Sequence, residues 1–215
     1  MTTIVVVRKG DTAVIGADTL GTYGDQRESA AFIKNASKLI AVDDTWLAAT
    51  GHAAMDMALR NIFIETRCRR SFKDVNDIYK TALQLHAMLK ENYFLKQDSD
   101  SGEDTFESMQ VSLLIANAHG IFGVCSKRTV LEYTKFYAFG SGEQYALGAM
   151  HAMYDKEEDP EKIARAGLEA SVAFDTGTGA PVEVQRVTLL APGRRSRWAP
   201  GRYVLSLRPR FSRSL

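Results

Sequence analysis

The residue with the clearest chemical potential in this 215-residue sequence is Thr2, in the opening stretch MTTIVVVRKGDTAVIGAD. Methionine is normally removed before a small residue, so we expect the mature chain to begin at Thr2. An N-terminal threonine carries a hydroxyl nucleophile and a free α-amine whose pKa of ~7.7–8.0 suits a general base. Most chains that begin Met-Thr use that threonine for no chemistry. The hypothesis therefore needs a charge partner, an oxyanion hole and a second hydroxyl elsewhere.

The composition is that of a globular protein, with 45% hydrophobic and 25% charged residues. We expect one domain over residues 1–190. There is no secretory segment and no apolar run that could span a bilayer, so we expect no membrane partner. Cys68 and Cys125 lie far apart and fit thiols in a reducing compartment, which favours a cytoplasmic location. The four histidines show no ligand spacing, so no metal site is expected; they are residues 52, 86, 119 and 151.

Positive charge is concentrated at the C-terminus. Residues 191–215 hold seven of the 27 basic residues and none of the 26 acidic ones, so the remainder has 20 basic against 26 acidic residues. A mildly acidic body gives no reason to expect nucleic acid as a partner. We expect the Arg-rich tail to be poorly ordered.

Hydrophobic periodicity predicts an α+β fold. Helices are expected over residues 51–69, after 74, through 145–153 and over 160–174, with a long loop over 18–35. The second helix is expected to be capped by the pair Ser71 and Asp74 and to bury Val75 and Leu83. The third is expected to bury Tyr145. Strands are predicted at 4–7, 13–18, 38–42, 45–50, 109–115, 121–126, 129–133, 136–139 and 182–189. This order favours a four-layer αββα sandwich, in which two antiparallel sheets pack face to face under helical layers.

Several short motifs, in this order and spacing, resemble the proteasome β-subunit family of N-terminal-nucleophile hydrolases over residues 2–190. The resemblance extends to HslV-type peptidases and to the bacterial proteasome homologue of beta-proteobacteria. One such motif would be weak evidence, but several in register are strong. They are Thr2-Thr3-Ile4-Val5, Ala17-Asp18-Thr19 with Thr22 and Gly24, Lys38-Leu39, Thr50-Gly51-His52-Ala53-Ala54-Met55-Asp56, Gly140-Ser141-Gly142 and Asp175-x-x-Thr178-Gly179.

The resemblance implies a threonine-type endopeptidase with Thr2 as nucleophile and no cofactor. Lys38 would lower the proton affinity of Thr2, and Asp18 would neutralise and orient Lys38. The segment between these two residues is about four residues longer than in ordinary β-subunits, so Lys34 competes with Lys38 for this role. An ordinary ion pair at the sheet edge is the simpler alternative for Asp18 and Lys38.

The remaining catalytic roles also follow from the resemblance. The Gly51 amide at the start of a helix would stabilise the oxyanion. Ser141 would hydrogen-bond the Thr2 amine, while Asp175 and Thr178 would hold that network from the other side. A capped helix end followed by a glycine turn is the plain alternative for Asp175 and Thr178.

Substrate is expected to bind as an added strand, and the first specificity pocket to be lined by small residues and to tolerate apolar side chains. The implied partners are polypeptide substrates, a homo-oligomeric ring and an ATP-dependent unfoldase. Two alternatives remain: a non-catalytic structural ring subunit and a small-molecule amidase of the same class. The expected substrate-binding residues are Gly21, Thr22, Ala49, Thr50 and Ala53, with Ala36 beside them.

Overall fold

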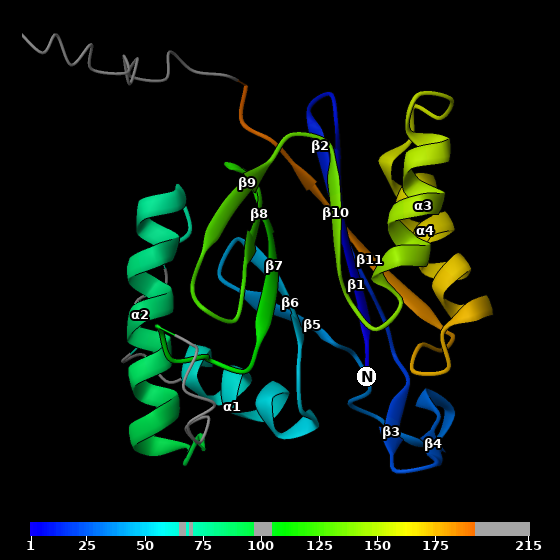
Figure 1. Ribbon diagram of the computed structural model, residues 1–215. Coiled ribbons are helices and arrows are strands. Elements are labelled where there is room, and N and C mark those ends of the chain that lie inside the picture. The colour runs from blue at the N-terminus through cyan, green and yellow to red at the C-terminus, as the bar shows by residue number, and fades with distance from the viewer. Residues whose placement is uncertain (65–67, 69–70, 97–104, 192–215) are drawn as a thin grey trace, which may run out of the picture.

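The computed structural model describes residues 1–64, 68, 71–96 and 105–191 (Figure 1). Two predicted features lie partly outside these residues. They are the end of the first helix beyond residue 64 and the Arg-rich tail over residues 191–215.

Two antiparallel sheets form the centre of the molecule. The first, here called the N-terminal sheet, has the order β10-β1-β2-β11. Its strands are β1 (Thr3–Lys9), β2 (Thr12–Asp18), β10 (Phe136–Gly140) and β11 (Val182–Thr188). The second sheet has the order β5-β6-β7-β8-β9. Its strands are β5 (Leu39–Val42), β6 (Thr45–Thr50), β7 (Ser112–Asn117), β8 (Gly120–Val124) and β9 (Val130–Tyr133).

Helices cover the outer face of each sheet, as Figure 1 shows. The second sheet is covered by α1 (Ala53–Ile64) and α2 (Val75–Asn92), and the N-terminal sheet by α3 (Glu143–Tyr154) and α4 (Pro160–Phe174). The predicted αββα sandwich is thereby confirmed. In the described part of the chain, buried apolar side chains form three clusters, one between the sheets and one under each helical layer. Among the described residues, no helix is long and apolar enough to cross a membrane.

Strand β1 is buried on both faces, which fixes the position of the chain's first residues. Ile4 and Val6 belong to the cluster between the sheets, whereas Val5 and Val7 belong to the cluster under α3 and α4. This split follows from the alternation of side chains along a strand. Burying each of these side chains contributes about 1.5–3 kcal/mol, so β1 is held firmly and Thr2 lies directly before its first residue.

The structure corrects the predicted long loop over residues 18–35. This segment contains a small hairpin of β3 (Gly21–Tyr23) and β4 (Gln26–Glu28), and a 3₁₀ turn, η1 (Ala30–Phe32), follows it. Strands of three residues are too short to show an alternating pattern. The hairpin projects at the lower end of the molecule in Figure 1.

Several predicted details of the helices were wrong. Asp74 alone caps α2, because its carboxylate accepts a hydrogen bond from the Asp77 amide, while the Ser71 hydroxyl bonds the Asp77 side chain instead. Val75, Leu83 and Tyr145 are exposed rather than buried. The buried stripe of α2 follows Ile78, Ala82, Leu85 and Leu89. Leu83 lies about 100° around the helix from Ala82 and therefore points toward solvent.

Candidate active site

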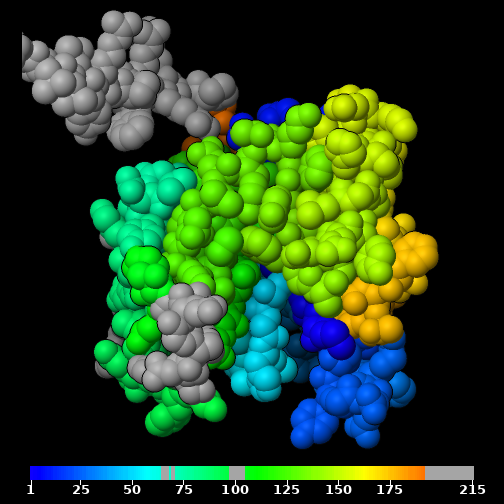
Figure 2. Space-filling model, viewed as in Figure 1, coloured from blue at the N-terminus to red at the C-terminus, as the bar shows by residue number. Residues whose placement is uncertain are grey.

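Thr2 lines a cleft of about 470 Å³ between the β3–β4 hairpin and the start of α1. In Figure 2 the dark blue N-terminal residues reach the surface between this hairpin and the cyan residues of the α1 region. The peptide bond from Met1 to Thr2 lies next to the cleft wall, because the Lys38 ammonium is 3.5 Å from the Met1 carbonyl oxygen. Thr2 directly precedes the buried strand β1 and lines the cleft, with 8% of its surface exposed.

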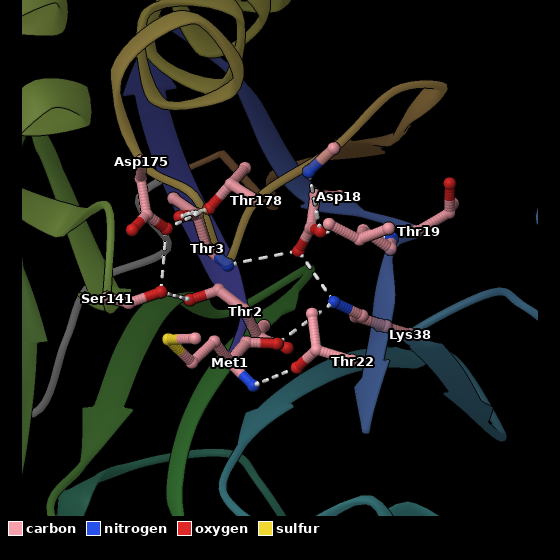
Figure 3. A network of polar contacts seen from close by, with 12 residues as sticks. Met1, Thr2, Thr3, Asp18, Thr19, Thr22, Lys38, Ser141, Asp175 and Thr178 are labelled. Atoms are coloured by element: carbon pink, nitrogen blue, oxygen red, sulfur yellow. Dashed lines mark hydrogen bonds and ion pairs between the residues drawn. The ribbon is translucent and has the colours of Figure 1, made fainter. Parts of the chain in front are cut away.

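Asp18 is the fully buried acceptor at the centre of the site (Figure 3). It ends β2, and its Oδ1 accepts hydrogen bonds from the Thr3 amide at 3.0 Å and from Lys38 Nζ at 2.8 Å. Its Oδ2 accepts from the amides of Leu20 at 3.0 Å and Gly179 at 3.1 Å. Four donors fix both oxygens, so the carboxylate has a single orientation and holds the Lys38 ammonium in turn.

The Lys38 ammonium is removed from most solvent, with its side chain 16% exposed. Burial lowers the pKa of Lys38 below the ordinary lysine value, and the carboxylate of Asp18 opposes this shift by its charge and hydrogen bond. The competing residue, Lys34, is exposed. Of these two lysines, Lys38 is the one paired with Asp18.

A chain of hydroxyl groups runs along the other side of Thr2. Asp175 Oδ2 accepts hydrogen bonds from Ser141 Oγ at 2.7 Å and from Thr178 Oγ1 at 2.5 Å, and Thr178 Oγ1 lies 2.6 Å from Thr3 Oγ1. A hydroxyl has one proton to donate. Because Thr178 donates to the carboxylate, Thr3 must be the donor in the Thr3–Thr178 pair. Burial raises the pKa of Asp175, but the bonds from Thr178 and Ser141 outweigh it and leave that pKa below its usual value.

Ser141 contacts Thr2 directly. Its amide donates to the Thr2 carbonyl at 2.9 Å, and its hydroxyl is 3.5 Å from the same oxygen. Since the hydroxyl proton is directed to Asp175 at 2.7 Å, the lone pairs of Ser141 Oγ are left to accept a proton donor. Gly140, with φ of +115°, precedes it, and a Cβ there would overlap the Thr2 carbonyl. Only glycine allows this close approach.

Gly51 also lines the cleft. Its φ is +135°, and a Cβ would come within 2.9 Å of the Gln110 carbonyl oxygen, so glycine is required. Helix α1 begins two residues later than the motif predicted. His52 caps it, because the Ala54 amide donates to His52 Nδ1 at 3.1 Å.

The cleft also brings together the residues predicted to bind substrate. Two come from the β3 strand, and the others from the chain before β5, the end of β6 and the start of α1. Ala36 and the other predicted residues have small side chains, but larger ones, among them Tyr23 and Met57, line the same cleft. The predicted residues that line it are Gly21, Thr22, Ala49, Thr50 and Ala53.

Sequence reasoning missed two groups that complete the site. Thr3 is fully buried and joins Asp18 to Thr178, through its amide and its hydroxyl respectively. The Gly179 amide fixes Asp18 Oδ2. Two sequence features could have indicated these residues. Thr3 is a polar residue at the start of an apolar strand, and Gly179 directly follows Thr178. No group of three or more His, Cys, Asp or Glu residues in the described part of the chain could hold a metal ion.

Comparisons with known proteins agree on one family. Residues 1–187 match the family described as "Proteasome subunit". A curated relative, "Proteasome subunit beta" from Nanoarchaeum equitans, is 25% identical over 200 residues, which cover 87% of this chain and 93% of the relative.

Solved structures show the same relationship. One described as Thiobacillus denitrificans BPH is 40% identical, with a TM-score of 0.82, covering 87% of this chain and 98% of that chain. Another, described as the same protein in complex with Epoxomicin, is 39% identical, with a TM-score of 0.82, covering 88% and 100%. HslV from Trypanosoma brucei shares the fold, with 22% identity and a TM-score of 0.60 over 86% of this chain and 99% of that chain.

Proposed function

The chain belongs to the proteasome subunit family, and from this premise we propose that it is a threonine-type endopeptidase subunit with Thr2 as nucleophile. The observation that carries the proposal is the position of Thr2 between the Lys38–Asp18 ion pair and the Ser141 hydroxyl, at the wall of an open cleft. A relative has been solved in complex with Epoxomicin, which is consistent with a peptidase site.

The reaction begins once Thr2 has a free α-amine. The Thr2 hydroxyl attacks a peptide carbonyl, and the α-amine of the same residue accepts the hydroxyl proton, directly or through a water. Collapse of the tetrahedral intermediate breaks the C–N bond, and the resulting α-ammonium donates its proton to the leaving amine. The acyl ester left on Thr2 is then hydrolysed by a water that the α-amine deprotonates. Base and nucleophile belong to one residue, so their geometry is set before substrate arrives.

Lys38 and Ser141 tune the α-amine from two sides. The ammonium of Lys38 lowers the proton affinity of the Thr2 α-amine, since a unit charge at ~4 Å is worth about 4 kcal/mol at an effective dielectric of ~20. The free lone pairs of Ser141 Oγ accept a hydrogen bond from the amine and orient it. Asp175 and Thr178 hold Ser141 in this orientation.

The Gly51 amide stabilises the oxyanion that forms when Thr2 attacks. Substrate lies along β3 as an added strand, bonded mainly through its main chain, and small side chains such as Ala49 leave room for apolar substrate side chains. Polypeptides are the substrates in this proposal, and copies of the chain form a ring that encloses the sites. An ATP-dependent unfoldase is the implied partner of such a ring.

Peptidase assays on Thr2 variants test the proposal. We expect Thr2→Ala to reduce kcat for a fluorogenic peptide by at least about 10³-fold, and Thr2→Ser, which keeps the hydroxyl, to remain active. Thr12→Ala removes a hydroxyl at the other end of the same sheet and serves as control. An assembled wild-type protein without activity, or activity that survives Thr2→Ala, would instead support the non-catalytic ring subunit or a different site.

A further inference from the structure

A second basic residue, Arg60 on α1, forms hydrogen bonds with the backbone on both sides of Lys38. Arg60 Nη2 donates to the Ser37 carbonyl at 2.6 Å and to the Leu39 carbonyl at 3.3 Å, the two residues on either side of Lys38. Its Nε donates to Asp56 Oδ2 at 2.7 Å, one helical turn earlier. We infer that Arg60 is a positioning residue for Lys38, an inference that rests on the proposed function.

Sheet pairing alone leaves this segment poorly fixed. β5 is at the edge of its sheet and begins at Leu39, which is paired with Ala48, so Lys38 lies one residue before the ladder. An edge strand has a row of backbone groups without a neighbouring strand. The guanidinium supplies donors to the carbonyl of Leu39 at the start of this strand and to that of Ser37 before it, and its planar fork can serve both of them and the Asp56 carboxylate at once.

A second anchor ties the same segment to the other sheet. Ser37 Oγ donates to Glu183 Oε2 at 2.5 Å, and Glu183 is on β11, directly after Val182, whose partner on β2 is Asp18. Ser37 is thus bonded to α1 through its carbonyl and to β11 through its side chain.

This arrangement matters because the ion pair spans the two sheets. Asp18 ends β2 of the N-terminal sheet, while Lys38 precedes β5 of the second sheet. Their 2.8 Å contact depends on where the Lys38 backbone lies, since a lysine side chain has a flexible four-carbon stem and loses rotamer entropy when held. Fixing the backbone at Ser37 and Leu39 limits the positions that the ammonium can take beside Thr2.

The test compares Arg60→Met and Arg60→Lys with Arg165→Met. Arg165 is a matched control because it forms the same i,i+4 pair on α4, from its Nε to Glu161 at 2.9 Å, away from Lys38. Measurements are kcat and KM for a fluorogenic peptide, the rate of covalent labelling by an epoxyketone, and thermal unfolding.

We expect Arg60→Met to lower kcat and the labelling rate by about 10- to 100-fold with KM changed less than about twofold, because a small misplacement of a catalytic group has that effect. Arg60→Lys should recover only part of the loss, since an ammonium lacks the fork. Arg165→Met should match wild type.

Equal kcat for folded Arg60→Met and Arg165→Met would overturn the inference. If Arg60→Met does not fold, Arg60→Lys decides: full wild-type kcat in that variant overturns the inference, and a severalfold loss at unchanged KM supports it. Wild-type activity that is insensitive to Thr2→Ala would reject the proposed function itself, which is a separate outcome.

Discussion

Replacing Asp18 by asparagine removes a buried carboxylate that four donors share. An asparagine has one oxygen and one NH₂ group, so either rotamer places the NH₂ against two donors. These are the Thr3 amide and Lys38 Nζ in one orientation, and the Leu20 and Gly179 amides in the other. Each buried donor left unsatisfied costs about 1–3 kcal/mol, and breaking a buried ion pair costs about 3–5 kcal/mol. We expect Asp18→Asn to lower the free energy of unfolding by about 3–5 kcal/mol near neutral pH.

The size of this loss depends on pH through Lys38. Burial already lowers the pKa of Lys38, and Asp18 is the main group that opposes the shift. Without Asp18 the folded-state pKa of Lys38 falls further below the unfolded value of about 10.4. Between the variant's folded pKa and that of wild type, the folded variant has lost a proton that the unfolded chain keeps. Its stability therefore rises with pH relative to wild type, by up to about 1.4 kcal/mol per pH unit.

Urea unfolding at fixed protein concentration, from about pH 7 to about pH 9, measures this directly. The difference between wild type and Asp18→Asn should shrink as pH rises. In a Lys38→Met background the same substitution should show no such trend, because the titrating group is gone. A pH-independent difference, or an equal slope in the Lys38→Met background, would refute the assignment of the effect to Lys38.

Three further changes probe other parts of the site and core. Ser141→Ala should lower kcat about 10- to 100-fold with a smaller effect on KM, since it removes the acceptor for the α-amine and the hydroxyl that donates to Asp175 but leaves the nucleophile in place; steady-state kinetics check this. Gly51→Ala should abolish measurable peptidase activity and lower the free energy of unfolding by about 1–3 kcal/mol, because its φ is +135° and the Cβ would lie 2.9 Å from the Gln110 carbonyl oxygen; calorimetry and kinetics on one sample check both. Tyr133→Phe should leave stability unchanged or raise it by up to about 1 kcal/mol, because the buried Tyr133 hydroxyl has no hydrogen-bond partner among the described residues; a clear fall in Tm would contradict this.

The strands and helices of the core could be predicted because their periodicity is strong. Val5 and Val7 alternate with Ile4 and Val6, and the structure divides them between two clusters as that pattern requires. The β3–β4 hairpin could not be predicted, because two three-residue strands show no period. Leu83 was misassigned because it is as apolar as its neighbours, and only packing decides which of them face the sheet.

The site was accessible to sequence reasoning only in part. Asp18, Lys38 and Ser141 come from three separate elements, and spacing along the chain does not say that they meet. Their association was suggested by the order of the motifs that resemble a known family. Arg60 had only the weak signal of an acidic residue four positions earlier, which many surface helices share. Its contact with the carbonyls beside Lys38 depends on the tertiary structure.

The most direct test of the central claim is the intact mass of the purified chain before and after treatment with an epoxyketone. Such an inhibitor can form a ring adduct by addition of both the hydroxyl and the free α-amine of an N-terminal threonine, with no atoms lost. The account predicts a chain that begins at Thr2 and gains one intact inhibitor mass, and no gain in Thr2→Ala. A chain that retains Met1, or one that begins at Thr2 and takes no adduct, would contradict the assignment of Thr2 as the nucleophile.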